Sequence, residues 1–352
     1  MIFGTTAAVS PGSPDGGGQL HGGTADGGTR TTGGAGDDLM AGTSAPAVDA
    51  EADAAPARGP GEEDARLTVS VVIPCHNCTA VLPEQLDALL GQAWQDGDEV
   101  LIADNGSTDD LHAIVAGYQD RLPGLRVVDA SARRGPAFAR NTGAEHARGE
   151  AVLFCDADDV VDAGWLAAMR RALAAHEFVA AALDRRRLNP PWTRRNGADR
   201  SELSDSNPPF LPYAFSAVMG VRRATHVAAG GFDESFADSC EDRDYCYRLQ
   251  LAGTPLVLAP GALVHYRVRD SYRSIFSNAR RYARGNVQLY RRYRSRGLRK
   301  HGTAHSLASW LTLLPKLMRT RGKRAELAKW CYQLGWLIGR LEGSVKHRVW
   351  AV

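Results

Sequence analysis

The stretch VLFCDADDVV, residues 152–161, starts as an apolar run that leads into three acids, Asp156, Asp158 and Asp159. Like charges this close repel one another, and burying them without partners is costly. The three acids must therefore be solvated or neutralised by a positive charge. Which of the two applies depends on what surrounds them in the fold.

Asp156 and Asp158 are two residues apart, so an extended chain directs both carboxylates to the same side. One Mg²⁺ or Mn²⁺ ion suits this arrangement, because these ions take oxygen ligands from one or two carboxylates and complete their shell with phosphate and water. A solvated turn or a helix N-cap is the alternative interpretation.

Apolar runs alternate with helical patterns on either side of this stretch. The predicted strands are 68–74, 99–104, 125–130 and 151–156, and the predicted helices are 82–93, 109–121 and 137–148. Apolar strands that alternate with helices are typical of a parallel sheet covered on both faces. Ligands of such sheets bind at the carboxyl ends of the strands. There the sequence places polar loops at 75–78, 104–107, 133–136 and 156–159.

The second half of the chain has a less regular pattern. Residues 185–209 are rich in Arg and Pro and indicate a long loop. We then expect a strand at 215–219, short helices from Arg222 and from Glu241, strand segments through Val264, and helices from Ser271 onward.

Charge is distributed unevenly along the chain. The net charge is only +2, yet residues 267–348 contain 21 Lys or Arg side chains against Asp270, Glu326 and Glu342. An anionic partner should therefore meet the C-terminal end. Residues 1–66 have almost no large apolar side chains, so we expect them to be disordered.

The six cysteines are too sparse for a disulfide scaffold and favour a reducing cytoplasm. Cys75 and Cys78 form a CxxC pair without a second pair or a nearby His pair, which favours a structural role over zinc binding or redox chemistry. The N-terminus lacks the pattern of a signal peptide, and no apolar run reaches the roughly 20 residues of a membrane span.

Seven short motifs in the same order resemble the family 2 glycosyltransferases of GT-A fold, of the non-processive bacterial type. They are VSVVIPCHN (69–77), ADNGSTDD (103–110), GPAFARNTGAEHARGE (135–150), VLFCDADDVVDAGWL (152–166), GGFDESF (230–236), CEDRDYCYRL (240–249) and VHYRVRDS (264–271). The resemblance implies an α/β fold with a Rossmann-like, mostly parallel sheet and a helical C-terminal extension.

The resemblance also implies a division of the chain. Residues 1–66 are a low-complexity tail, and 67–270 are the GT-A catalytic domain. Within that domain 67–160 would bind the nucleotide-sugar donor and 161–270 the acceptor, and 271–352 form a basic helical region.

In such enzymes Mg²⁺ or Mn²⁺ bridges the diphosphate of a nucleotide-sugar, with UDP-sugars favoured here and GDP- or dTDP-sugars as alternatives. By motif match, Pro74, Asn77 and Asp104 contact base and ribose, and Asp156 is the donor-site acid. Asp158 is the expected direct metal ligand. His265 follows a late strand, where many members place a further metal ligand; a satisfied surface histidine is the alternative.

The motif match assigns the catalytic base to Asp242 and a role in shaping the acceptor site to Glu241. A carboxylate can remove the proton of an attacking hydroxyl, and a single displacement inverts the anomeric configuration. Acids in the first turn of a helix are the structural alternative for this pair. Arg140, Arg269 and Arg273 are candidates to face phosphate, with a solvated surface role as the alternative.

The expected acceptor is a hydroxyl of a glycan, a glycolipid or another cell-surface precursor, and no nucleic acid is expected as a partner. The chain lacks the QxxRW motif of processive synthases, which favours transfer of one or a few sugars. Residues 306–318 and 326–350 lie either on an anionic membrane surface, at the inner face of the cell membrane, or against the catalytic domain or another subunit of a homo-oligomer.

Two other functions fit parts of the sequence. A sugar-1-phosphate nucleotidyltransferase also uses an α/β sheet, a nucleotide and a metal, but PCHNC (74–78) offers no Gly-rich phosphate loop. A non-catalytic nucleic-acid-binding protein would use the arginine-rich C-terminal region. The acids at the sheet argue against this function, because they would repel the phosphates of a nucleic acid.

Overall fold

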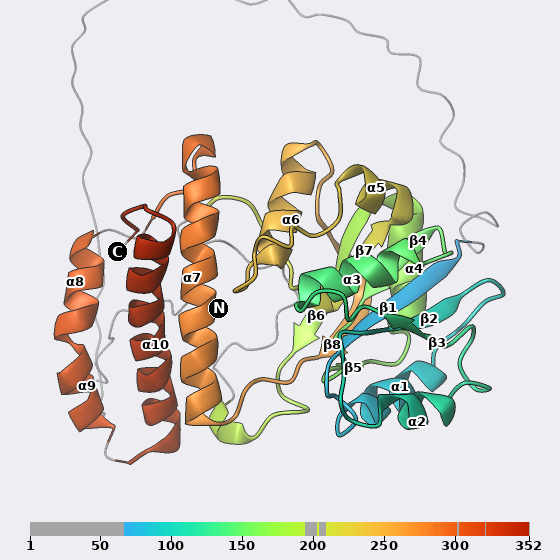
Figure 1. Ribbon diagram of the computed structural model, residues 1–352, viewed down its shortest axis with the longest axis horizontal. Coiled ribbons are helices and arrows are strands. Elements are labelled where there is room, and N and C mark those ends of the chain that lie inside the picture. The colour runs from blue at the N-terminus through green and yellow to red at the C-terminus, as the bar shows by residue number, and fades with distance from the viewer. Residues whose placement is uncertain (1–66, 194–202, 204–208, 301–302, 321, 352) are drawn as a thin grey trace, which may run out of the picture. The chain divides into compact units, whose positions relative to one another are not determined.

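The computed structural model describes residues 67–193, 203, 209–300, 303–320 and 322–351. The expected disordered tail, 1–66, and most of the long loop at 185–209 lie outside these residues. The described strands form a single sheet in the order β3-β2-β1-β4-β7-β6-β8-β5. The sheet and the C-terminal helices that follow it are shown in Figure 1.

The first half of the sheet is parallel, as the sequence predicts. Its strands are β1 (Val69–Cys75), β2 (Glu99–Asp104), β3 (Arg126–Asp129) and β4 (Ala151–Phe154). They are connected by α1 (Leu82–Leu90), α2 (Leu111–Ala116) and α3 (Pro136–Glu145). Figure 1 shows α1 and α2 on one side of these strands and α3 on the other.

Burial explains why β1 and β4 are mostly apolar. All four residues of β4 are buried, and β1 is buried at every position except Pro74. The helix α3 approaches the sheet closely because it carries Gly143, where a Cβ would lie 2.4 Å from Cγ1 of Val72. Because β1 pairs in parallel with both β2 and β4, the carboxyl ends of the three strands lie at the same edge of the sheet.

The second predicted helix is shorter than 109–121. It ends at Gly117, whose N–H bonds to the Ile114 carbonyl, and the chain continues through turns as far as Leu122. Glycine has low helix propensity and Pro123 cannot continue a helix, which accounts for the early end.

The second half of the sheet is mixed. Its elements are β5 (Val160–Val161), α4 (Trp165–Ala175), β6 (Phe178–Asp184), η2 (Pro191–Thr193), η3 (Ser216–Val218), β7 (Met219–Arg222), α5 (Arg223–Ala228), α6 (Glu241–Leu251) and β8 (Val257–His265). β7 is antiparallel to both β4 and β6, β5 is antiparallel to β8, and β6 is parallel to β8.

The expected strand at 215–219 is wrong. Residues 216–218 form a 3₁₀ turn in which the Val218 N–H bonds to the Phe215 carbonyl, and the strand begins only at Met219. Gly220 permits the close pairing that follows, since a Cβ there would lie 2.7 Å from Cδ2 of Leu153.

The C-terminal region is helical, as expected. Its elements are α7 (Tyr272–Tyr293), η4 (Arg294–Arg296), α8 (Thr303–Leu311), α9 (Leu313–Arg319) and α10 (Arg324–Lys346). α7 starts with a capping box between Ser271 and Ser274. Among the described residues, no helix combines the length and the apolar composition that crossing a bilayer requires.

Helices α7 and α10 lie side by side (Figure 1) and approach closely along three glycines of α10, Gly335, Gly339 and Gly343. A Cβ on Gly339 would lie only 2.1 Å from the backbone oxygen of Arg280. Glu342 adds ion pairs from α10 to Arg280 and Arg284 of α7. Close packing of the two backbones and ion pairs therefore both stabilise the contact between α7 and α10.

A buried carboxylate connects α7 to the sheet-bearing part of the chain. Asp244 of α6 is fully buried and accepts a hydrogen bond from the Tyr293 hydroxyl at 2.7 Å. It is also paired with Arg248 at 2.8 Å and with Arg292 at 2.7 Å. Two cations and a hydroxyl compensate the buried charge, so α7 is an integral part of the same folded unit.

Replacing Gly339 by Ala should force α7 and α10 apart, because the added methyl meets backbone rather than a movable side chain. We expect a loss of about 1–3 kcal/mol in the free energy of unfolding, measured by denaturant titration. Gly91→Ala is the matched control, since its Cβ would find its nearest neighbour at an ordinary 3.8 Å. Equal stabilities for the two variants would contradict this packing.

Candidate active site

The loops after β1 and β2 are joined by Asn77. Its Oδ1 accepts the Thr108 N–H at 2.7 Å, and its N–H donates to the Ser107 hydroxyl at 3.1 Å. Its φ of 51° is a left-handed conformation, which Asn tolerates better than most residues. Asp104, at the end of β2, accepts the Ser107 N–H at 2.8 Å. Pro74, Asn77 and Asp104, all predicted to contact a nucleoside, thus lie at adjoining strand ends.

A second asparagine joins the loops after β2 and β3. The buried Asn105 donates to the carbonyls of Ala130 at 2.6 Å and Arg133 at 2.7 Å, and its Oδ1 accepts the Gly135 N–H at 2.8 Å. Three of the four polar loops that the sequence places at this edge are therefore connected by side-chain hydrogen bonds.

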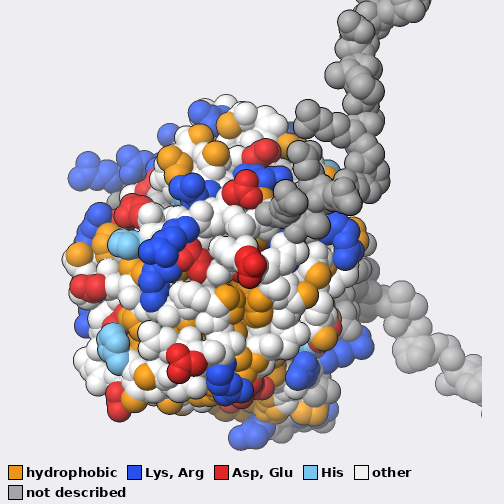
Figure 2. Space-filling view, turned by 90° about the vertical axis from the view of Figure 1, so that its right-hand side faces the viewer, with side chains coloured by type: hydrophobic (Ala, Val, Ile, Leu, Met, Phe, Trp, Pro, Cys, Tyr) orange, Lys and Arg blue, Asp and Glu red, His pale blue; other side chains and the backbone are white. Residues whose placement is uncertain are grey.

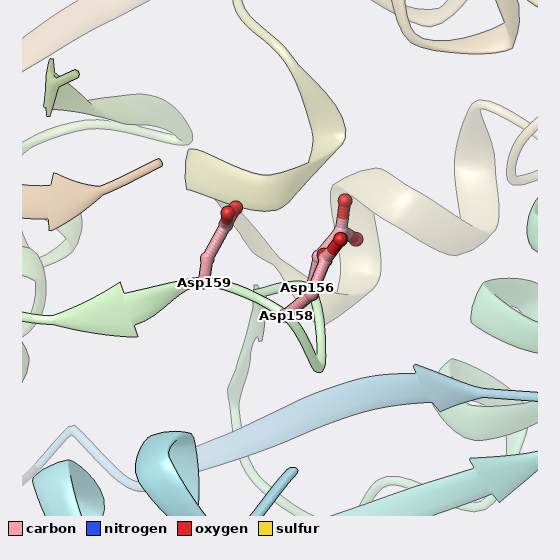
Figure 3. Close-up of side chains that lie close together, drawn as sticks. All are labelled: Asp156, Asp158 and Asp159. Atoms are coloured by element: carbon pink, nitrogen blue, oxygen red, sulfur yellow. The ribbon is translucent and has the colours of Figure 1, made fainter. Parts of the chain in front are cut away.

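The fourth loop, after β4, carries the acid cluster Asp156, Asp158 and Asp159. One ligand atom of each residue lies within 4.8 Å of the others, and Figure 3 shows the three carboxylates on the same side of the loop. Burial, and then repulsion from Asp156, raises the pKa of Asp158 and raises that of Asp159 more strongly. The cluster thus holds more negative charge than its surroundings stabilise.

Three arginines compensate part of this charge. Arg140 of α3 binds Asp156 at 2.6 Å, and Arg269 lies 3.4 Å from Asp158. Arg267 donates its N–H to Oδ1 of Asp159 at 2.8 Å and its Nε to the carbonyl of Asp158 at 2.9 Å. The other oxygen of Asp159, Oδ2, is buried and has no hydrogen-bond partner among the described residues. Clustered carboxylate oxygens with this orphaned atom fit a hard divalent cation such as Mg²⁺ or Mn²⁺.

Arg140 also connects the acid cluster to the start of α6. Its guanidinium is buried and lies 3.3 Å from Glu241 as well as 2.6 Å from Asp156. The sequence predicts that Arg140 contacts phosphate, whereas in the structure it is paired with two carboxylates, one after β4 and one at the start of α6. Its position between them makes it a residue that fixes their separation.

Asp242 lies beside Glu241 in the first turn of α6, after Cys240 in a left-handed conformation. Burial, and then repulsion from Glu241, raises the pKa of Asp242 to about 7. Its Oδ1 accepts only the Arg243 N–H, at 2.7 Å, among the hydrogen bonds of the described residues. A half-buried carboxyl with a pKa near neutrality is suited to accept a proton at physiological pH.

His265, the third predicted metal ligand, ends β8 outside the acid cluster. Its Nδ1 lies 2.7 Å from Asp184 and its Nε2 lies 3.1 Å from Asp162, so both ring nitrogens already contact carboxylates. The structure brings Asp156 and Asp158 together. His265 could bind the same metal only if one of its ring nitrogens left its carboxylate partner. Its role as a ligand stays a prediction.

Sequence reasoning missed two groups at this edge. Arg267 lies within the motif VHYRVRDS, where Arg269 was singled out instead, and its backbone and side chain both reach the acid cluster. Asn141 follows Arg140 and binds the backbone of Phe232 at 2.8 and 2.9 Å, which attaches α3 to the GGFDESF segment. The one signal in the sequence for Arg267 and Asn141 is that both lie within motifs that resemble the family.

Residues 70–236 match the family model described as "Glycosyl transferase family 2". This region belongs to glycosyltransferase family 2. The chain is 30% identical over 233 residues to the pre-mycofactocin glycosyltransferase of Mycobacterium tuberculosis, a match that covers 62% of this chain and 46% of that protein. It is 27% identical over 237 residues to the validoxylamine A glucosyltransferase of Streptomyces hygroscopicus subsp. limoneus, covering 57% and 51%. The chain thus spans about half the length of these relatives.

Among solved structures, the mannosyltransferase of Pyrobaculum calidifontis in complex with GDP-Man and Mn²⁺ is similar, with a TM-score of 0.56 and 21% identity. The match covers 80% of this chain and 86% of that one. The predicted GT-A fold is confirmed, and the predicted resemblance to family 2 is confirmed for residues 70–236.

Replacing Arg140 by Met should leave Asp156 and Glu241 partly buried without their shared cation. We expect the free energy of unfolding at pH 8 to fall by roughly 3–5 kcal/mol, the range for breaking a buried pair. Arg133→Met is the control, because its partner contact with Glu234 is made by a side chain that is 68% exposed. If both variants unfold at the same denaturant concentration, the Arg140 bridge does not stabilise the site.

Proposed function

We propose that the chain is a metal-dependent, inverting glycosyltransferase that moves a sugar from a nucleoside diphosphate to a hydroxyl group. The observation that supports this proposal is that the acid cluster and Asp242 lie in one site and have different surroundings. The acid cluster at the end of β4 is suited to a cation, and Asp242 is suited to take a proton. Arg140 connects the two.

Asp158 and Asp156 would hold Mg²⁺ or Mn²⁺, which when bound supplies a Lewis acid for the departing diphosphate. Pro74, Asn77 and Asp104 would position the nucleoside across the joined loops. The structural neighbour with GDP-Man and Mn²⁺ supports a nucleotide-sugar with a metal. A UDP-sugar is the leading donor, with GDP- and dTDP-sugars as alternatives.

Asp242 would accept the proton of the acceptor hydroxyl, and Glu241 would help to shape the acceptor site. One displacement at the anomeric carbon inverts the configuration, whereas retention by double displacement needs a carboxylate that attacks the sugar. Residues 67–160 would bind the donor and 161–270 the acceptor, followed by the helical region 271–352.

The acceptor is proposed as a hydroxyl of a glycan, a glycolipid or another cell-surface precursor. The names of the two relatives denote different acceptors, in keeping with acceptor pockets built by variable loops. We place the enzyme in the cytoplasm, at the inner face of the cell membrane. The free cysteines, five of them buried, support a reducing compartment.

The donor is tested by thermal unfolding of the purified chain with UDP, GDP, dTDP or CMP, each with and without Mn²⁺. One diphosphate should raise the unfolding temperature only with Mn²⁺, because a ligand at about 100 times its Kd adds roughly 2.7 kcal/mol to the folded state. Asp158→Asn should abolish the shift. Asp120→Asn, an exposed acid away from the cluster, should keep it. No shift with any nucleotide in folded protein would refute the proposal.

The raised pKa of Asp242 predicts two pH dependences with opposite directions. The folded chain retains a proton up to about pH 7 that the unfolded chain releases near pH 4, so stability falls as the pH rises between them. The turnover rate should instead rise through about pH 7, as the base loses its proton.

Asp242→Asn removes the group whose ionisation lowers the stability between about pH 4 and pH 7. The variant should therefore be more stable than wild type at pH 8 and about as stable at low pH. It should also lose sugar transfer while keeping the nucleotide-induced thermal shift. A variant that retains wild-type transfer rates would exclude Asp242 as the base.

A further inference from the structure

Exposed apolar side chains are concentrated in the C-terminal helices. Nine large apolar side chains are exposed among the described residues, and seven of them lie in the segment 303–351. Four of these belong to α8 and α9: Leu307, Leu311, Leu314 and Met318, with exposures of 59, 71, 66 and 76%. We call these four side chains the apolar stripe.

The four residues follow one another at intervals of four, three and four, which places them on one side of a helix. The short break between α8 and α9 preserves this side, because Thr312 keeps a helical conformation and its N–H bonds to the Ala308 carbonyl at 3.0 Å. The stripe is therefore continuous across both helices.

The opposite side of α8 and α9 packs on α10. Trp330 donates to the Leu313 carbonyl at 2.9 Å, Gln333 to the Ser309 carbonyl at 3.2 Å, and Arg340 to the Ser306 hydroxyl at 3.3 Å. These contacts fix the rotation of the two helices with the apolar stripe directed away from α10.

The segment that carries the stripe has charges of one sign. No Asp or Glu occurs between Asp270 and Glu326, a segment that carries 15 Lys or Arg residues. Arg319 and Lys323 are exposed at the end of α9 and just after it. On the face shown in Figure 2, by contrast, acidic and basic side chains are interspersed.

We propose that the apolar stripe is a docking surface for an anionic lipid bilayer. Leu and Met side chains would enter the boundary between headgroups and acyl chains, and the flanking cations would meet lipid phosphates. A second copy of the chain fits less well, because a two-fold contact through the stripe would bring together two segments that each carry Lys and Arg but no Asp or Glu between residues 271 and 325. Lipid binding needs no donor, so it is independent of the proposed sugar transfer.

The full chain is tested by co-sedimentation with vesicles of phosphatidylcholine alone and with about one-third phosphatidylglycerol. We expect binding to the anionic vesicles, weaker at high salt because the charge contribution is screened. Leu311→Glu combined with Met318→Glu should lower the partition coefficient more than about tenfold, since both apolar contacts are lost. Val227→Glu, at another exposed apolar position, should bind as wild type does.

The altered side chains are exposed, so the variants should keep the wild-type unfolding temperature. If the double variant does not fold, Leu314→Asn is the milder change to the same stripe, and it should lower binding in the same direction. The proposal is overturned if wild type stays in the supernatant, or if a folded stripe variant binds equally well. It is also overturned if the stripe variants dissociate a dimer while lipid binding is absent.

Discussion

Repulsion among the three carboxylates that follow β4 is the constraint on which the rest of this structure depends. Asp156, Asp158 and Asp159 lie within ligand distance of one another, and burial raises the pKa of the latter two. Their arginine partners come from α3 and from the segment after β8, so the same interactions that limit the repulsion bring distant parts of the chain to one edge. The compensation is incomplete, and within the part of the chain that the structure describes a buried oxygen of Asp159 has no hydrogen-bond partner. Positive charge is therefore in deficit at the carboxyl ends of the strands, where a parallel sheet binds its ligands.

Arg140 connects the acid cluster after β4 with the start of α6. It is buried between Asp156 and Glu241, so the separation of these two carboxylates is set by one rigid, permanently charged group. Asp242 adjoins that pair and has a pKa of about 7, which results from its burial and from its neighbour. The burial of Asp242 beside Glu241 lowers the stability of the folded chain above neutral pH, and it produces a carboxyl group that exchanges a proton near neutral pH. This cost is consistent with strained electrostatics being tolerated at functional sites.

Much of the first half of the fold could be predicted from sequence, because buried strands have a simple apolar signature, which β1, β4 and the interior of β2 carry. The polar residues after each strand could be predicted for the same reason. The antiparallel β7 could not, since a short segment around Gly220 pairs through contacts distant in sequence. Nor could the surroundings of His265, whose partners Asp162 and Asp184 lie 103 and 81 residues away. Arg267 was overlooked because nothing local separates it from the many other arginines.

The most direct test of this account is anomalous diffraction from Mn²⁺ in crystals of the chain grown with a nucleoside diphosphate. The account predicts one peak at coordination distance from an oxygen of Asp158, next to the diphosphate and at the carboxyl end of β4. A crystal containing bound nucleotide but no Mn²⁺ there, or Mn²⁺ held only between His265, Asp162 and Asp184, would contradict it. The position of the ion alone decides whether the acid cluster is the metal site.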